Sequence, residues 1–136
     1  MSQKLRVATI GAGYFSNYQY EAWKRMEDVE LVAICNRTEA KGKEFAKHYD
    51  IPGIYTELPK LLDDVKPDVV DIITPPETHL IYIQEIAKRG IPMICQKPFT
   101  PNLAMAKEAV QTAENGGAKL IIHENFRFQP WFREAR

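Results

Sequence analysis

The sequence predicts an α/β fold in which a doubly wound parallel sheet of about six strands is covered by helices on both faces. Three observations lead to this class. Short β-branched runs alternate with longer amphipathic stretches along the chain, a pattern typical of repeated strand–helix–strand units. The strand runs are mostly continuous in apolar character, as expected for strands buried on both faces. A glycine-containing turn directly follows the first strand.

The first half of the chain contains three expected strands and three expected helices. The strands are Leu5–Ile10, Glu30–Cys35 and a short one, Gly53–Tyr55. The helices between and after them cover Phe15–Met26, Glu39–Tyr49 and Glu57–Asp64. In the first helix four apolar residues recur at helical spacing and are expected on one side: Tyr18, Ala22, Trp23 and Met26.

The second half continues the alternation with the strands Val69–Thr74, Met93–Gln96 and Lys119–His123. The helix Glu77–Arg89 begins behind Pro75-Pro76 and ends before Gly90, which are typical start and stop signals. The helix Asn102–Asn115 has apolar residues at helical spacing and ends at a Gly-Gly pair.

Length, charge and cysteine content exclude several classes of protein. The chain has 136 residues, which fits one domain. Its 18 Lys and Arg cancel 18 Asp and Glu, whereas a nucleic-acid module shows a basic excess. The longest apolar run has five residues, against about 20 for a membrane helix. Cys35 and Cys95 are far apart and indicate neither a disulfide framework nor a metal site, so we expect a cytoplasmic protein and an inert Cys95 thiol.

The turn after the first strand reads Gly11-Ala12-Gly13-Tyr14-Phe15-Ser16. Gly11 permits a tight turn, Gly13 lets the backbone approach a pyrophosphate, and the small Ser16 permits close contact between helix and strand. A tight turn without a ligand is the alternative for so short a motif. Its position between a strand and a helix favours a Rossmann-like fold that binds a dinucleotide at the helix N-terminus.

The residue that contacts the ribose is expected about 20 residues after this turn, at the end of the second strand. That residue is Asn36, and Arg37 follows it. An acidic residue there would repel the 2′-phosphate of NADP, whereas Asn36 is neutral and Arg37 can face the phosphate or stack on adenine. The pair slightly favours NADP, or tolerance of both NADP and NAD. A polar strand end with a solvated Arg37 is the alternative.

Three later strand ends carry further motifs: Thr74-Pro75-Pro76-Glu77-Thr78-His79, Gln96-Lys97-Pro98 and Asn125-Phe126-Arg127-Phe128. In this order and spacing, and with the glycine turn, they resemble the N-terminal half of the glucose-fructose oxidoreductase, inositol dehydrogenase and rhizopine-catabolism family (Gfo/Idh/MocA). The family pattern is a Gly-x-Gly-x-x-Gly or Ala turn, a Thr-Pro followed by His, a Glu-Lys-Pro, and an Asn-x-Arg aromatic segment. The resemblance covers essentially the whole chain.

This resemblance implies a catalytic role for Lys97 and a cis peptide bond between Lys97 and Pro98. A lysine beside the nicotinamide can hydrogen-bond the substrate oxygen and stabilise alkoxide character; a surface lysine in a loop is the alternative. The other matched positions are expected to contact the cofactor, and no metal ligand is implied. With the turn residues 11–16, Asn36, Arg37 and Lys97, the expected cofactor-binding residues are Thr74, Pro75, Pro76, His79, Gln96, Asn125 and Arg127.

Departures from the family pattern limit what is carried over. Gln96 stands where the family has Glu, so any electrostatic role of that position toward Lys97 is in doubt. His79 is expected at a helix start and is not assigned a catalytic role. For Asn125 and Arg127 two roles remain open: contacts to cofactor or substrate, or a hinge to a following domain.

The resemblance implies that residues 1–124 form the NAD(P)-binding domain of an oxidoreductase acting on a hydroxyl group of a sugar, polyol or related small molecule. Residues 125–136 would begin the connection to a second domain, absent from this chain, that supplies substrate contacts and a homo-oligomer interface. Pro130–Arg136 begins like a helix and stops, which suggests a chain cut from a longer one. We expect it to bind nucleotide without turnover. The rivals are a non-catalytic nucleotide sensor of the same family and a methyltransferase or flavodoxin-like domain.

Overall fold

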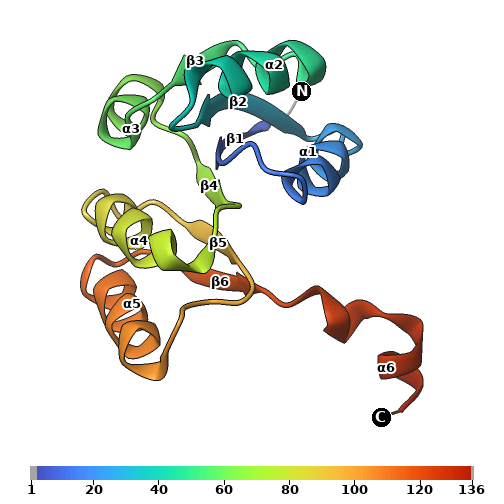
Figure 1. Ribbon diagram of the computed structural model, residues 1–136, viewed down its shortest axis with the longest axis vertical. Helices are drawn as coiled ribbons and strands as arrows, with labels where there is room; N and C mark the ends of the chain where they lie inside the picture. The colour runs from blue at the N-terminus through green and yellow to red at the C-terminus, as the bar shows by residue number, and fades with distance from the viewer. Residues whose placement is uncertain (1–2, 136) are drawn as a thin grey trace.

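A single parallel sheet of six strands organises the chain, and a computed structural model describes it for residues 3–135 (Figure 1). The strand order is β3-β2-β1-β4-β5-β6, and each neighbouring pair is parallel. The order reverses between β1 and β4, which is the topological switch point of a doubly wound sheet. Met1, Ser2 and Arg136, which the expected domain boundaries include, lie outside the described residues.

The strands and helices follow the predicted alternation. The strands are β1 (Leu5–Ile10), β2 (Val29–Cys35), β3 (Gly53–Tyr55), β4 (Val69–Ile72), β5 (Met93–Gln96) and β6 (Leu120–His123). The helices are α1 (Ser16–Lys24), α2 (Glu39–Tyr49), α3 (Leu58–Val65), α4 (His79–Ala87), α5 (Leu103–Asn115) and α6 (Pro130–Glu134), with 3₁₀ turns at Pro76–Thr78 and Asn125–Phe128.

Two apolar cores lie on opposite faces of the sheet. Helices α3, α4 and α5 cover one face, where Leu61, Ile83 and Ala109 pack against strand residues such as Ile10. Helices α1 and α2 cover the other face over β1 and β2, where Tyr20 belongs to the core. Continuous apolar strands are therefore buried from both sides, as the sequence predicts.

One part of the sheet is only partly covered by the helices described. On the side of α1 and α2, the strands β4, β5 and β6 present Asp71, Ile94, Ile121 and His123, which the parallel registers place on one face. Ile121 is 46% exposed there. Among the helices described in residues 3–135, α1 reaches this part of the sheet with two side chains, because Trp23 bonds to Asp71 and Gln19 to His123, and Figure 1 shows the body of α1 over the β1–β2 side.

The prediction for the apolar side of the first helix is wrong. The residues that α1 buries are Ser16, Gln19 and Tyr20, while Tyr18 is 60% exposed and Met26 lies beyond the helix end. The helix turns its small and hydrogen-bonding residues toward the sheet because Tyr20 bonds to the glycine turn beneath it. The apolar residues Ala22 and Trp23 instead flank the partly covered strands.

Several element boundaries differ from the predictions by one or two residues. Strand β4 ends at Ile72 rather than Thr74, and a 3₁₀ turn precedes α4, because the Pro75-Pro76 pair cannot extend either element. Helix α5 begins after Asn102, whose side-chain oxygen accepts a hydrogen bond from the Met105 N–H at 3.0 Å. This is an ordinary N-cap.

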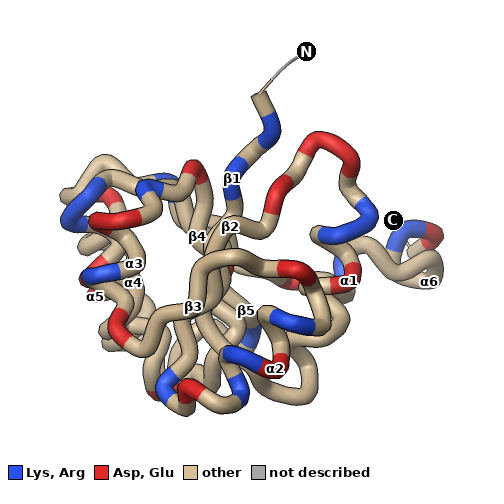
Figure 2. Tube along the Cα trace, turned by 90° about the horizontal axis from the view of Figure 1, so that it is seen from above, with Lys and Arg blue, Asp and Glu red and all other residues tan. Residues whose placement is uncertain are grey.

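The C-terminal segment extends away from the sheet (Figure 1). Phe128 is 67% exposed and Trp131 is 64% exposed, and Phe126 stacks on Phe132 at 6.3 Å between ring centroids. Acidic and basic residues are interleaved along the chain (Figure 2). None of the helices described in residues 3–135 has the length and apolar character needed to cross a membrane.

Candidate functional site

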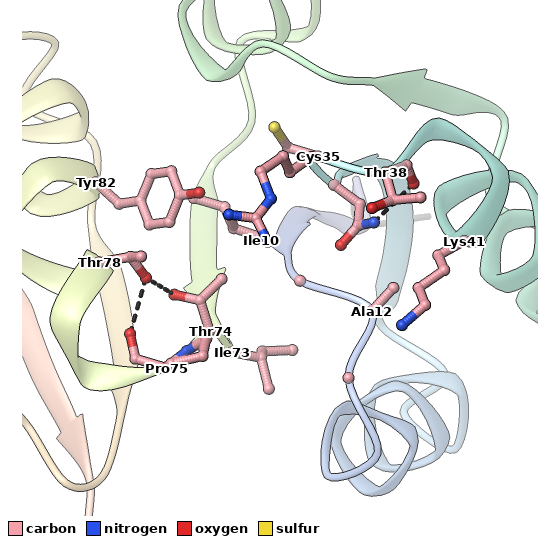
Figure 3. Close-up of a pocket in the computed structure, with 14 residues that line it drawn as sticks. Ile10, Ala12, Cys35, Thr38, Lys41, Ile73, Thr74, Pro75, Thr78 and Tyr82 are labelled. Atoms are coloured by element: carbon pink, nitrogen blue, oxygen red, sulfur yellow. Dashed lines mark hydrogen bonds between the residues drawn. The ribbon is translucent and has the colours of Figure 1, made fainter.

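A cavity of about 290 Å³ lies at the carboxyl ends of β1, β2 and β4, at the switch point of the sheet (Figure 3). Seven predicted residues line it: Gly11, Ala12, Gly13, Asn36, Arg37, Thr74 and Pro75. Seven further lining residues were not predicted: Ile10, Cys35, Thr38, Lys41, Ile73, Thr78 and Tyr82. Ligands of open α/β sheets bind at this kind of position.

Glycine stands at positions 11 and 13 of the first turn for two different structural reasons. Gly11 has φ +112°, and a Cβ there would lie 2.8 Å from the carbonyl oxygen of Ile73. Only glycine fits that backbone without strain. A Cβ at Gly13 would meet nothing within 4 Å, so Gly13 faces open space. The turn thus leaves backbone accessible at the entrance to α1, whose first turn contains no acidic residue.

A buried hydroxyl anchors this turn from below. The Tyr20 O–H donates to the carbonyl oxygen of Gly11 at 2.9 Å, and its oxygen lies 2.7 Å from Thr9 Oγ1. Tyr20 is completely buried, and burial raises its pKa, so it remains protonated and able to donate. The Ser16 hydroxyl also donates to the Gly13 carbonyl. The backbone of the turn is therefore held in place without a ligand.

The end of β2 presents polar groups to the cavity. The Asn36 amide nitrogen donates to the Thr38 carbonyl at 2.8 Å, which turns the amide and leaves its oxygen as an acceptor. Arg37 lies on the same rim, and Lys41 in the first turn of α2 adds a second cation. The sequence analysis did not predict Lys41. Its only signal was that it follows Arg37 by four residues, a spacing that lets both side chains reach one site.

The end of β4 forms the opposite wall. The Thr78 hydroxyl lies 2.8 Å from both Thr74 Oγ1 and the Pro75 carbonyl, which fixes the turn between strand and helix (Figure 3). Tyr82 follows one helical turn after Thr78 and faces the cavity from α4. Burial raises the Tyr82 pKa, and Arg37 acts in the opposite direction across the cavity. Tyr82 was not predicted, although its four-residue spacing from Thr78 on a helix indicates that both residues face the same side.

His79 lies behind this wall rather than in it. Its side chain is completely buried and does not line the cavity. Nε2 lies 2.7 Å from the Thr74 carbonyl oxygen, and Nδ1 lies 2.8 Å from the Phe99 carbonyl oxygen. The ring therefore links the loop after β4 to the loop after β5.

The loop after β5 carries the lysine that the family resemblance indicates. The Lys97–Pro98 peptide bond is cis, as predicted. The Gln96 side-chain oxygen accepts the Lys97 backbone N–H at 2.8 Å, so the neutral amide holds the loop and not the ammonium group. Lys97 is exposed, with Nζ 5.1 Å from the centroid of the Phe126 ring. This contact is a cation–π interaction.

The remaining predicted residues, including Ser16, do not line the cavity. Tyr14 and Phe15 are 76% and 70% exposed and pack edge to face at 5.6 Å. Asn125 and Arg127 lie in the exposed 3₁₀ turn after β6, where Arg127 contacts the Phe128 ring at 5.5 Å. Pro76, Gln96 and Lys97 are likewise absent from the lining.

The two thiols are poor nucleophiles. Burial raises the Cys35 pKa to about 11, and burial together with nearby Asp71 raises the Cys95 pKa to about 12. Both cysteines are free and buried. Among residues 3–135, no three His, Cys, Asp or Glu side chains gather in a cluster that could hold a metal ion.

A doubly wound parallel sheet with a glycine turn and a cavity at its switch point defines a dinucleotide-binding domain of the Rossmann type. Residues 5–124 match the Gfo/Idh/MocA family in its N-terminal part, described as "Oxidoreductase family, NAD-binding Rossmann fold". The chain belongs to this family.

Several relatives and solved structures share the domain. The chain is 34% identical over 128 residues to a D-apiose dehydrogenase of Paraburkholderia graminis, covering 94% of this chain and 34% of the relative. It is 30% identical to the D-glucoside 3-dehydrogenase of Escherichia coli, covering 93% of this chain and 36% of the relative. An oxidoreductase from Agrobacterium radiobacter, solved with NAD+, L-tartaric acid and magnesium, superposes with a TM-score of 0.89 at 37% identity, covering 93% of this chain and 37% of that one. The chain thus spans between a third and two fifths of the length of these proteins.

Proposed function

We propose that this chain binds NAD(P) in the switch-point cavity as the cofactor domain of a dehydrogenase. The enzyme would transfer hydride to or from a hydroxyl-bearing carbon of a sugar, polyol or related small molecule. One observation carries the proposal: the glycine turn, the Asn36-Arg37 pair and the Thr74-Pro75 pair line a single cavity. The family also includes relatives named D-apiose and D-glucoside 3-dehydrogenase, which supports the substrate class.

The residues present fit a dinucleotide. Open space beside Gly13 and the N-terminus of α1 suit a pyrophosphate that approaches the backbone closely. The free oxygen of Asn36 can accept a hydrogen bond from a ribose hydroxyl. Arg37 and Lys41 would pair with a 2′-phosphate, and the site lacks the acidic side chain that would repel one. We therefore infer a modest preference for NADP, with NAD also accepted.

Lys97 is the residue we assign to catalysis. The nicotinamide of the bound cofactor supplies or accepts the hydride. Lys97 would donate an N–H to the substrate oxygen and stabilise the negative charge on that oxygen while the carbon–hydrogen bond of the substrate breaks or forms. Gln96 holds the Lys97 backbone, and His79 links this loop to the loop after β4, whose residues Thr74 and Pro75 line the cofactor cavity.

We further propose that residues 1–124 are the cofactor domain and that 125–136 begin the connection to a substrate domain. This second domain would supply most substrate contacts and the surface for homo-oligomer formation. The chain spans about a third of the length of its relatives, which supports this division. The two free thiols support a reducing compartment such as the cytoplasm.

Isothermal titration calorimetry of this chain with NADP and NAD tests the proposal. We expect both to bind, with NADP binding more tightly, and Gly13→Ala to weaken both. S-adenosylmethionine and FMN serve as controls for the other nucleotide-binding folds and should not bind. The proposal would be contradicted if neither NADP nor NAD binds. A strong preference for NAD would overturn the role assigned to Arg37.

A non-catalytic nucleotide sensor is the second candidate, favoured by the neutral Gln96 in place of the family's Glu. The two functions separate in a protein that contains both domains. Lys97→Ala should abolish hydride transfer and leave cofactor affinity within about twofold if the protein is an enzyme. A wild-type two-domain protein that binds NADP and reduces no sugar or polyol would instead support the sensor.

A further inference from the structure

The ammonium group of Lys97 lies against an aromatic ring from a different segment of the chain. Its Nζ is 5.1 Å from the centroid of the Phe126 ring, within the distance of a cation–π interaction. Lys97 follows β5, and Phe126 lies in the 3₁₀ turn after β6. The two strands are parallel neighbours with Gln96 opposite His123, so their carboxyl ends meet at one edge of the sheet. The sheet itself therefore brings the lysine and the ring together.

No carboxylate within residues 3–135 takes the place of this ring. None of the Asp and Glu side chains described there forms a salt bridge with Lys97. The neighbouring Gln96 is neutral, and its side-chain oxygen accepts the Lys97 backbone N–H. The Glu124 carboxylate accepts the backbone N–H of Phe126 at 3.1 Å. The face of the Phe126 ring is thus the electrostatic partner that the described residues offer to the ammonium group.

The turn after β6 holds this ring in place. Its backbone is fixed on both sides of Phe126, because Glu124 accepts the Phe126 N–H and the Gln129 N–H donates to the Phe126 carbonyl at 3.0 Å. The ring is stacked on Phe132, with 17° between the two ring planes. An exposed lysine side chain otherwise samples many rotamers. A fixed ring can therefore restrict the directions in which the ammonium group points.

We propose that Phe126 is a positioning residue for Lys97, whose ammonium group it holds at the carboxyl end of β5 through the face of its ring. The inference rests on the proposed function, in which Lys97 donates an N–H to the substrate oxygen. Phe126 does not line the cofactor cavity. It acts through Lys97, by restricting the ammonium group before the substrate arrives.

A ring suits this task better than a carboxylate does. The lysine ammonium group has three N–H donors and no acceptor. A carboxylate would take up one or more of these donors in a charge-assisted hydrogen bond, which the substrate oxygen would then have to displace. The ring attracts the positive charge through its quadrupole instead. Phe126 can therefore restrain Lys97 and leave N–H groups free to donate.

The test is NMR of the chain labelled with ¹³C-lysine, in which Lys97 is assigned by its absence from Lys97→Arg. In the wild type the ring current of Phe126 should move the protons on Lys97 Cε upfield. Phe126→Leu should remove this shift and lower the ratio of held to free ammonium about two- to fivefold, as measured by ¹³C relaxation at Cε. Phe126→Tyr keeps an aromatic face and should preserve both. Phe128→Leu is the matched control, because this ring lies in the same turn but contacts Arg127, and it should change neither.

A fluorinated ring separates electrostatic attraction from packing. Trifluorophenylalanine at position 126 keeps the shape of the ring and withdraws negative charge from its face, so it should free Lys97 nearly as much as Phe126→Leu does. A purely structural role would not respond to this change, and the ring fits the turn even if Phe126→Leu does not. The inference is overturned if Lys97 Cε is equally mobile in the wild type and Phe126→Leu, or if the fluorinated ring holds it as the natural ring does. These measurements need neither cofactor nor turnover, so they decide the role of Phe126 separately from the catalytic role of Lys97.

Discussion

Tyr20 on α1 and Gly11 in the turn after β1 are joined by a hydrogen bond of 2.9 Å from the phenolic hydroxyl to the carbonyl oxygen. The same hydroxyl lies 2.7 Å from Thr9 Oγ1, so one buried group links the strand, the turn and the helix. Gly11 lines the cofactor cavity and Tyr20 does not. Tyr20 therefore supports the cavity from the apolar core of the sheet.

Tyr20→Phe should lower the free energy of unfolding by about 1–3 kcal/mol, because it leaves the Gly11 carbonyl buried without its donor. Chemical denaturation measures the change. Tyr18→Phe is the matched control, since Tyr18 lies on the same helix but is 60% exposed, and it should change stability by less than about 0.5 kcal/mol. Equal effects of the two variants would refute the structural role of the Tyr20 hydroxyl.

The two glycines of the turn should respond differently to alanine. Gly11→Ala should cost at least about 2 kcal/mol of stability, because it combines a positive φ with a backbone clash against Ile73. Gly13→Ala should leave stability within about 0.5 kcal/mol, because its Cβ meets open space. It should nevertheless weaken NADP binding about tenfold or more, since the methyl group occupies space beside the pyrophosphate. Denaturation and calorimetry on both variants separate the two effects.

The sequence predicted the fold and half of the cavity because both depend on local patterns. Strand and helix alternation determines the sheet, and the turn at Gly11, the ribose position at Asn36 and the Thr74-Pro75 pair stand at strand ends that a parallel sheet brings together. The long-range parts were not predictable from these patterns. Tyr82 and Lys41 enter the cavity from helices, so their contribution depends on how each helix is rotated on the sheet.

The face of α1 that packs on the sheet shows why helical spacing alone could not predict the orientation of this helix. The spacing of Ala22 and Trp23 predicted a buried apolar side, but a hydrogen bond from Tyr20 to the turn rotates the helix away from that orientation. Trp23 then donates to Asp71, 48 residues away in the sequence. A contact between two distant residues leaves no periodic signal in a single sequence.

His79→Phe should destabilise the chain by about 2 kcal/mol or more, since it removes the ring that bridges the Thr74 and Phe99 carbonyls and leaves at least one of them without its hydrogen-bond donor. It should also weaken NADP binding, because the loops after β4 and β5 lose their connection beside the cavity. Thermal unfolding with and without NADP measures both effects. His48→Gln, at an exposed position on α2, is the control and should change neither quantity.

Arg37→Ala should reduce the affinity for NADP about tenfold to a hundredfold, because the variant loses a charge-assisted hydrogen bond to the 2′-phosphate. Affinity for NAD should change by less than about threefold, because NAD lacks that phosphate. Calorimetry with the two nucleotides gives the ratio directly. Arg25→Ala removes the same charge at the far end of α1 and should leave the ratio unchanged. A proportional loss for NAD and NADP would indicate that Arg37 stacks on the adenine instead.

Stability should depend on pH through Asp71. Burial raises its pKa from the ordinary value of 3.8 to about 6, although the Trp23 hydrogen bond lowers it in part. Between these two values the folded chain binds more protons than the unfolded chain, so the free energy of unfolding falls as pH rises from about 4 to 6. The full loss corresponds to about 3 kcal/mol for a shift of this size.

Other carboxylates act in the opposite direction, and Asp71→Asn isolates the effect. Arg89 holds the pKa of Asp63 below its usual range, and Lys88 together with Arg89 does the same for Glu85, so the contribution of both carboxylates is lost as pH falls. The pH dependence of the wild-type unfolding free energy is the sum of both contributions. Subtracting the curve of Asp71→Asn removes the contribution of the other carboxylates, which both proteins share. We expect Asp71→Asn to gain stability relative to wild type between pH 4 and 6 and to keep that gain at pH 7.5. A difference that does not change with pH would show that Asp71 is ionised normally in the folded chain.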